Sequence, residues 1–109
     1  MPEPGDIVTA DFVGAAGTKR RPAVVVSSKL YHQHRPDIVL AVLTTRPVHP
    51  MTPTDYLLQD WAQAGLHQPS TLRAFFSMSL PRVVRVIGHL SERDWLAAQE
   101  RLKLALAVR

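Results

Sequence analysis

Apolar and polar residues alternate in short runs along much of the chain, a pattern that predicts half-buried β-strands. Residues 7–13 alternate with a period of two and include several β-branched side chains. Residues 23–28 and 38–43 are almost continuously apolar, which is typical of central strands buried on both faces. Further strands are predicted for residues 55–58, 69–80 and 82–90.

The segments between these strands are polar or rich in glycine and proline. Residues 14–20, which hold two glycines, are expected to form a flexible loop with a cationic end. Residues 30–37 are expected to be a polar connection, and the prolines of residues 46–54 exclude a regular element there. Residues 59–66 allow one or two turns of helix that end at Gly65.

The last segment predicts the clearest helix. Ser91 is a good N-cap, and Glu92 and Asp94 place carboxylates in the first turn, where they interact favourably with the helix dipole. Apolar residues then recur at helical spacing and are expected to pack on the sheet: Trp95, Ala98, Leu102 and Leu106. These elements together predict a mainly β fold (β-rich α+β), a small curved antiparallel barrel with a C-terminal helix.

The composition is that of one folded domain spanning residues 1–109. Of these residues, 46% are apolar and 20% are charged, which argues against a disordered chain. No apolar run approaches the roughly 20 residues that a membrane span requires, and the acidic, proline-rich residues 1–6 differ from a secretory signal. We therefore expect a cytoplasmic protein with no membrane partner. The chain has no cysteine, which excludes disulfides and thiolate sites.

The charge is basic. Thirteen Lys and Arg residues face nine Asp and Glu residues, which gives a formal net charge of +4. Most of these cations are arginines, whose planar guanidinium matches phosphate. A polyanion such as RNA or DNA is one explanation, and a generic basic surface is the other. The charge alone does not separate the two.

Most familiar catalytic patterns are missing. The sequence has no phosphate-binding P-loop and no dinucleotide-binding glycine motif. His32 and His34 are spaced to share one side of an extended segment, but a metal site needs a third ligand, so we expect no metal and no cofactor. Cations and hydroxyls remain at the ends of buried strands, with Arg21 before one strand and Thr44 and Thr45 after another. Such positions are rigid and open to solvent, which suits a binding or catalytic group.

Three segments together resemble the MazF/PemK (Kid) family of toxins from type II toxin–antitoxin systems. The first is G-D-I-V and D-F within residues 5–12, followed by R-R-P-A-V-V-V-S at residues 20–27. The second is V-L-A-V-L-T-T at residues 39–45. The third combines A-G-L and P-S within residues 64–70 with I-G-H-L-S at residues 87–91. The match covers nearly the whole chain in the right order, and its first segment is the most specific.

The resemblance implies an SH3-like antiparallel barrel that forms a homodimer. It implies a metal-independent, sequence-selective endoribonuclease that cleaves single-stranded RNA, usually mRNA. In that reaction the 2′-oxygen of the RNA attacks the phosphate, and the products carry a 2′,3′-cyclic phosphate and a 5′-hydroxyl. The implied partner is a cognate acidic antitoxin, and DNA is bound only through that antitoxin.

By matching position, Arg21 is the family's catalytic arginine, and Thr44 is the strand-end threonine that hydrogen-bonds the phosphate or the 2′-oxygen. Arg73 falls where some members carry a second catalytic arginine. The residues expected to bind the RNA are Lys19, Arg20, Thr45 and Arg73.

The chain departs from Kid-like members in the region after Arg73. Phe75 stands where they carry an aspartate that is thought to act as the base, and Met78 and Ser79 replace an arginine–threonine pair. The general base is then Asp11, a histidine or water, or the activity is weak or repurposed. Two alternatives stay open: a nucleic-acid-binding barrel without chemistry, and a gyrase-binding toxin similar to CcdB.

Overall fold

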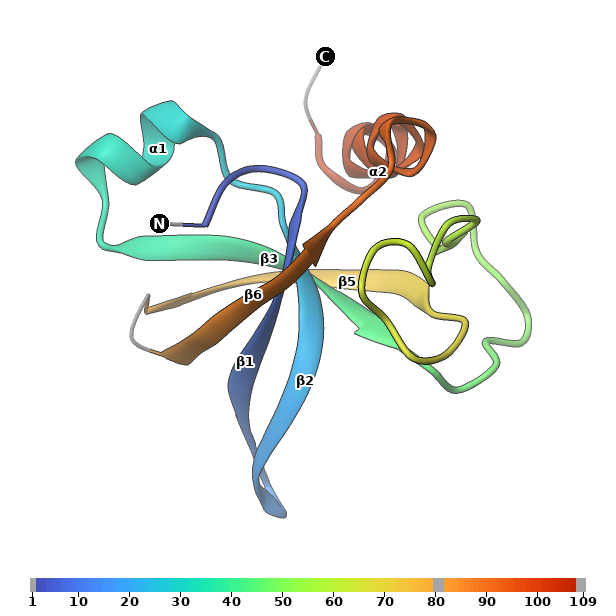
Figure 1. Cartoon of the computed structure of the whole chain (residues 1–109), viewed down its shortest axis with the longest axis horizontal. Helices are drawn as coiled ribbons and strands as arrows, with labels where there is room; N and C mark the ends of the chain where they lie inside the picture. Colours follow the sequence, from blue (N-terminus) through green and yellow to red (C-terminus); the bar gives the residue numbers. More distant parts are fainter. Residues whose placement is uncertain (1, 80–81, 108–109) are drawn as a thin grey trace.

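The computed structural model of the chain describes residues 2–79 and 82–107, with the backbone alone for residues 74–79. Its elements follow in the order β1 (Asp6–Gly14), β2 (Gly17–Val25), α1 (Lys29–His34), β3 (Asp37–Thr44), β4 (Tyr56–Leu57), β5 (Thr71–Ser79), β6 (Val83–His89) and α2 (Glu92–Ala105). The six strands form one sheet in the order β4-β5-β3-β2-β1-β6, and the neighbouring strands are antiparallel (Figure 1). The predicted mainly antiparallel β fold with a C-terminal helix is confirmed.

The sheet is strongly curled. In its strand order, β3, β2 and β1 lie between β5 and β6. In a flat sheet four strand spacings would separate β5 from β6 by roughly 19 Å. Ser79 ends β5 and Val83 begins β6, and a chain segment of that length spans at most about 14 Å. The two strands must therefore approach each other around the sheet, as the predicted small barrel requires.

Both faces of the central strands are buried. Ile7, Val24 and Ala41 are aligned across β1, β2 and β3, and they belong to an apolar cluster that also contains Leu43 and, from α2, Ala98. A second cluster contains the residues that point the opposite way: Val8, Ala10, Ala23, Val25, Ile38 and Leu40. This double burial explains why residues 23–25 at the end of β2 and residues 38–43 of β3 are continuously apolar, and it confirms the predicted central position of these two strands.

The predicted glycine loop at residues 14–20 is instead a hairpin. β1 ends at Gly14 and β2 begins at Gly17, and these two glycines pair across a two-residue turn. The cations that follow are extended strand residues, since Lys19 pairs with Phe12 and the ladder continues toward the core. The hairpin projects away from both helices (Figure 1). The prediction was wrong because it read the glycines as a long flexible loop, whereas the β1 ladder holds residues 17–21 extended.

Two other connections also differ from the prediction. The expected polar connection at residues 30–37 instead contains most of α1, because the Ser28 side chain accepts a hydrogen bond from Tyr31 N and caps the helix. Residues 59–66 form turns instead of the expected helix, because the first two amides of this segment bind Asp94 of α2. Gly65 closes these turns with a φ of +92°.

The predicted C-terminal helix is confirmed, including its N-cap Ser91, whose side chain accepts a hydrogen bond from Asp94 N. Ala98 is fully buried and Trp95 packs against the first cluster. Leu106 was expected to pack on the sheet, but it is the C-cap and is 49% exposed, because the helix ends at Ala105.

Leu80 of the predicted fifth strand lies outside the described residues. Within the described part of the chain, neither helix has the length and apolarity to span a membrane.

Candidate functional site

A basic hollow lies where β2 and β3 separate. Their ladder ends at the pair Ala23–Val42, although β2 extends to Gly17 and β3 to Thr44. The space beyond this pair has a volume of about 450 Å³. We call it the arginine hollow, and it is lined by Lys19, Arg20, Arg21, Pro22, Leu43 and Thr45. Several of the residues predicted to bind RNA therefore lie together.

Arg21 and Thr44 lie on the same face of the sheet. Each is two residues beyond the pair Ala23–Val42, and side chains two residues apart point the same way in a strand. Thr44 itself is not among the residues that line the arginine hollow, whereas Thr45 is. Thr44 Oγ1 accepts a hydrogen bond from Arg46 N at 3.2 Å, so its own hydroxyl proton is left to donate.

The two adjacent arginines differ in their partners. Arg20 Nε donates to Asp11 Oδ1 at 2.9 Å, and its Nη2 lies 3.4 Å from Asp11 Oδ2. The hydrogen bond from Arg20 lowers the pKa of Asp11, and the same bond raises the pKa of Arg20. Arg21 forms no hydrogen bond or ion pair with another described residue. Its guanidinium therefore keeps all of its donors for an anion.

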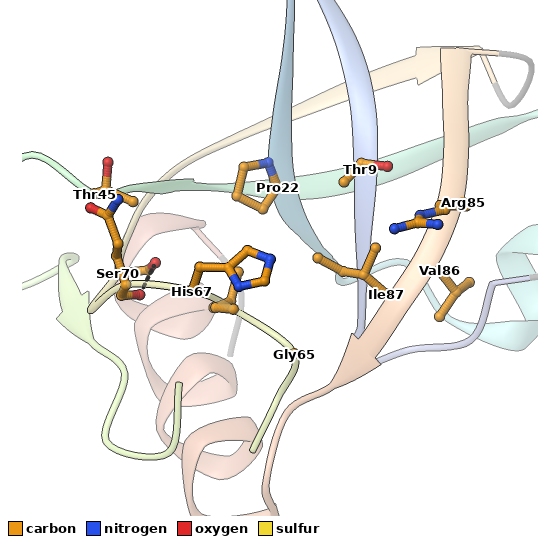
Figure 2. A pocket seen from close by; sticks show the side chains of 11 residues that line it. Thr9, Pro22, Thr45, Gly65, His67, Ser70, Arg85, Val86 and Ile87 are labelled. Atoms are coloured by element: carbon orange, nitrogen blue, oxygen red, sulfur yellow. Dashed lines mark hydrogen bonds between the residues drawn. The ribbon is translucent and has the colours of Figure 1, made fainter. Parts of the chain in front are cut away.

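A larger hollow adjoins the first one. We call it the large hollow. It has a volume of about 670 Å³, and its wall includes Thr9, Pro22, Thr45, His67, Arg85 and Ile87 (Figure 2). It shares Pro22 and Thr45 with the arginine hollow, so the two are neighbouring parts of one depression. His67 and Arg85 were not predicted as site residues. A cation amid the valines of residues 83–86 was the only local signal for Arg85.

One side of the large hollow is built on a very close backbone contact. A Cβ atom placed on Gly88 would lie 1.8 Å from the carbonyl oxygen of Ala64, and one placed on Gly65 would lie 2.4 Å from that of Ile87. Only glycines allow the turn after residue 59 to approach β6 this closely. The contact joins the A-G-L and I-G-H-L-S motifs, which lie far apart in the chain, and it sets the distance between the two sides of the hollow.

A polar cluster ties the adjoining segment to α2. The side chain of Asp94 is fully buried and accepts hydrogen bonds from Tyr56 Oη at 2.7 Å, Gln59 N at 3.0 Å and Asp60 N at 2.8 Å. Burial, followed by the bond to Asp94, raises the pKa of Tyr56 to about 12. Asp60 in turn accepts two bonds of 2.6 Å from Arg93. That pairing, with a smaller contribution from a bond donated by the N-cap serine of α2, lowers the pKa of Asp60 to about 2.

The structure does not bring Arg73 into the arginine hollow. Arg73 is the extra residue of a β-bulge in β5, because Leu72 pairs with Leu43 while the next pair joins residues 74 and 42. Its side chain is exposed. Phe75, which stands at the Kid-like aspartate position, is aligned with Ala41 in the same ladder, and its side chain lies outside the described part, as do those of Met78 and Ser79. Across the described residues, no three His, Asp or Glu side chains cluster as metal ligands would.

The fold is shared with solved toxin structures. The Mycobacterium tuberculosis toxin MazF-mt6 has a TM-score of 0.77 at 22% identity, over 95% of this chain and 98% of that one. An endoribonuclease from a mycobacterial species, in complex with its cognate antitoxin, has a TM-score of 0.81 at 17% identity, over 100% and 98%. MazF in a MazE–MazF crystal structure (Form-III) from Deinococcus radiodurans has a TM-score of 0.79 at 22% identity, over 99% and 98%. These likenesses define the fold class.

The family follows from the sequence itself. The model of the PemK-like, MazF-like toxins of type II toxin–antitoxin systems matches residues 3–106, so the chain belongs to that family. No curated protein matched the chain in a sequence search. The resemblance drawn from the sequence motifs is confirmed.

Proposed function

We propose that this toxin is an endoribonuclease that cuts single-stranded RNA without a metal, leaving 2′,3′-cyclic phosphate and 5′-hydroxyl ends. The observation that carries the proposal is the position of the Arg21 guanidinium. It lines a hollow rich in cations, lies on the same face as Thr44, and has no partner among the described residues. The toxin family agrees with this activity, as do the mycobacterial endoribonucleases among the structural neighbours.

The proposed reaction needs the protein to assist two proton transfers and to stabilise charge on the phosphate. The 2′-hydroxyl loses its proton as its oxygen bonds to phosphorus, the phosphate gains negative charge, and the 5′-oxygen takes up a proton as its bond to phosphorus breaks. Arg21 is suited to stabilise the negative charge on the phosphate, because a guanidinium donates to two phosphate oxygens at once. Thr44, whose hydroxyl proton is available, donates to the phosphate or to the 2′-oxygen.

The remaining residues bind and orient the RNA. Lys19 and Thr45 line the arginine hollow and contact the RNA backbone, and Arg20 contributes charge while it stays paired with Asp11. Arg73 contacts the RNA outside that hollow. Asp11 is a poor choice as the base, since Arg20 occupies its carboxylate and lowers its pKa. A histidine or a water molecule is left to accept the proton.

The proposed regulator is an acidic antitoxin segment that covers the basic depression, and the proposed assembly is a homodimer. The net charge of +4 favours an acidic partner. One mycobacterial endoribonuclease was solved with its cognate antitoxin and one Deinococcus MazF with MazE, which agrees with such a partner. Contact with DNA would then occur only through the antitoxin.

The test is cleavage of a defined, unstructured RNA in the presence of EDTA, with mapping of both product ends. Replacement of Arg21 by Ala should lower the rate by a factor on the order of 10²–10³ while the circular dichroism spectrum stays unchanged. Lys103→Ala is the matched control, because it removes one positive charge from the exposed side of α2. Cleavage at the normal rate by Arg21→Ala would show that Arg21 has been misassigned. Salt-dependent binding of intact RNA by the wild type would favour a barrel without chemistry.

A further inference from the structure

The large hollow has a wall that suits a flat aromatic ring. Pro22, Leu66, Val86 and Ile87 give it an apolar lining, and the imidazole of His67 points into it (Figure 2). Such surfaces bind a nucleobase by stacking, which single-stranded nucleic acids allow because their bases are unpaired. The volume of about 670 Å³ is ample for one purine.

Arg85 provides the polar side of the same hollow. It extends from β6 toward the space that His67 enters from the opposite side (Figure 2). It forms no ion pair with another described residue, so no neighbouring carboxylate occupies its guanidinium. The guanidinium has only donors, in a fork that matches two adjacent acceptors. Guanine presents such a pair in N7 and O6, whereas adenine presents an acceptor beside a donor.

The large hollow adjoins the arginine hollow that Arg21 lines, because the two share Pro22 and Thr45. Thr9 of β1 is aligned with Pro22 on one side and with Arg85 on the other, so the three residues form one row across the sheet. Two strand spacings put the backbones of Pro22 and Arg85 roughly 10 Å apart. Arg21 is the next residue along β2, so its side chain leaves the opposite face of the strand, and it lines the adjoining arginine hollow where β2 and β3 separate. An RNA whose phosphate is held by Arg21 at that edge can therefore place a neighbouring base in the large hollow.

We propose that the large hollow is a base-specificity site, in which Arg85 selects guanine at one fixed position beside the cleaved bond while His67 and the apolar wall stack on the ring. The ligand class, single-stranded RNA, rests on the proposed function. Arg85 is not required for the chemical step. Arg85 is a specificity residue, and its loss changes which RNA is chosen.

The first experiment compares wild type, Arg85→Ala and Lys103→Ala on a pool of single-stranded RNA with random sequence. The wild type should favour guanine over the other bases at one position beside the cut by roughly tenfold. Arg85→Ala should lose that preference while it still cuts, and Lys103→Ala should keep it. Because Arg85 is exposed, its truncation should leave the fold intact. Arg85→Gln, which keeps the length and removes the charge, is the second variant.

The second experiment separates binding from cutting. The probe is an oligonucleotide with 2′-deoxyribose at the cut site, carrying either guanine or 7-deazaguanine, which lacks the N7 acceptor, at the selected position. The deaza change should weaken binding by the wild type by roughly tenfold and leave binding by Arg85→Ala unchanged. If the wild type cuts no RNA, the proposed function fails, and selection of binders from the same random pool then identifies the position for the probe and still tests the hollow.

Three results would overturn the proposal. One is a wild type with no base preference, or with a preference for a base other than guanine. Another is an equal effect of 7-deazaguanine on the wild type and on Arg85→Ala. The last is a uniform loss of binding by Arg85→Ala across all sequences, which would make Arg85 a phosphate contact.

Discussion

Arg20 and Asp11 are joined side by side across β1 and β2, with Arg20 Nε 2.9 Å from Asp11 Oδ1. Alternation along the strand turns Arg20 to the face opposite that of Arg21. The two adjacent arginines therefore differ in whether an ion pair occupies the guanidinium. Arg20 is held by a carboxylate, and Arg21 is left to bind an anion.

The pairing predicts the effect of removing the Asp11 carboxylate. Asp11→Asn should change the rate of RNA cleavage by less than about tenfold, whereas loss of a general base costs on the order of 10²–10⁴. The physical reason is that Asp11, with its pKa lowered by Arg20, is a weak proton acceptor. The measurement is the single-turnover rate on one RNA at neutral pH.

Glu100→Gln is the control for this variant, because it removes an exposed carboxylate from the helix α2. A fall of two orders of magnitude in Asp11→Asn, with Glu100→Gln unchanged, would assign the base to Asp11 and contradict this prediction.

The contact between the turn and β6 predicts that Gly88→Ala is destabilising. The added methyl group would meet the carbonyl oxygen of Ala64 at 1.8 Å, so one backbone segment must move. Overpacking of this kind costs roughly 1–3 kcal/mol. The free energy of unfolding in urea should fall by that amount, and because the turn borders the large hollow, RNA binding should weaken as well. Gly14→Ala, whose Cβ would have only one neighbour at 3.8 Å, should stay near wild type. Equal stability of the two variants would show that the turn is not held against β6.

The Tyr56–Asp94 bond predicts how stability depends on alkaline pH. The pKa of Tyr56 is raised from 10.0 to about 12 in the folded protein. Below pH 10 the hydroxyl is protonated in both states, so the stabilisation is complete. Between pH 10 and 12 the unfolded chain ionises first, and this contribution is lost as the pH rises.

The check is Tyr56→Phe, with the free energy of unfolding measured at pH 8 and again near pH 11. At pH 8 the variant should be less stable by about 1 kcal/mol, because buried Asp94 loses a hydrogen bond. Its stability should also fall less steeply than that of the wild type as the pH rises. Parallel curves for the two proteins would mean that the tyrosine hydroxyl does not titrate differently on folding.

Several strands and the last helix could be predicted from the sequence, because the pattern of neighbouring apolar and polar residues reflects which faces of an element are buried. Val24 and Ala41 belong to continuous apolar runs, since their strands are covered on both faces. Ser91 signals the start of α2 by its own capping chemistry. The same local reasoning failed for residues 59–66, whose amides bind a carboxylate from a helix much later in the chain.

The sequence by itself determined the family, the mainly antiparallel β fold and the prediction that Arg21 binds the phosphate, because motifs, apolar periodicity and charge are properties of neighbouring residues. Only the tertiary structure decided which arginine is paired and which residues enclose the large hollow. Arg20 and Arg21 are adjacent in the chain, but the register between β1 and β2 aligns Asp11 with Arg20 alone. Arg85 and Pro22 line the same hollow because both of their strands pair with β1. One side of that hollow forms where Gly65 and Gly88 allow two backbone segments to come into close contact. Contacts of this kind depend on strand register and close approach, which no local pattern encodes.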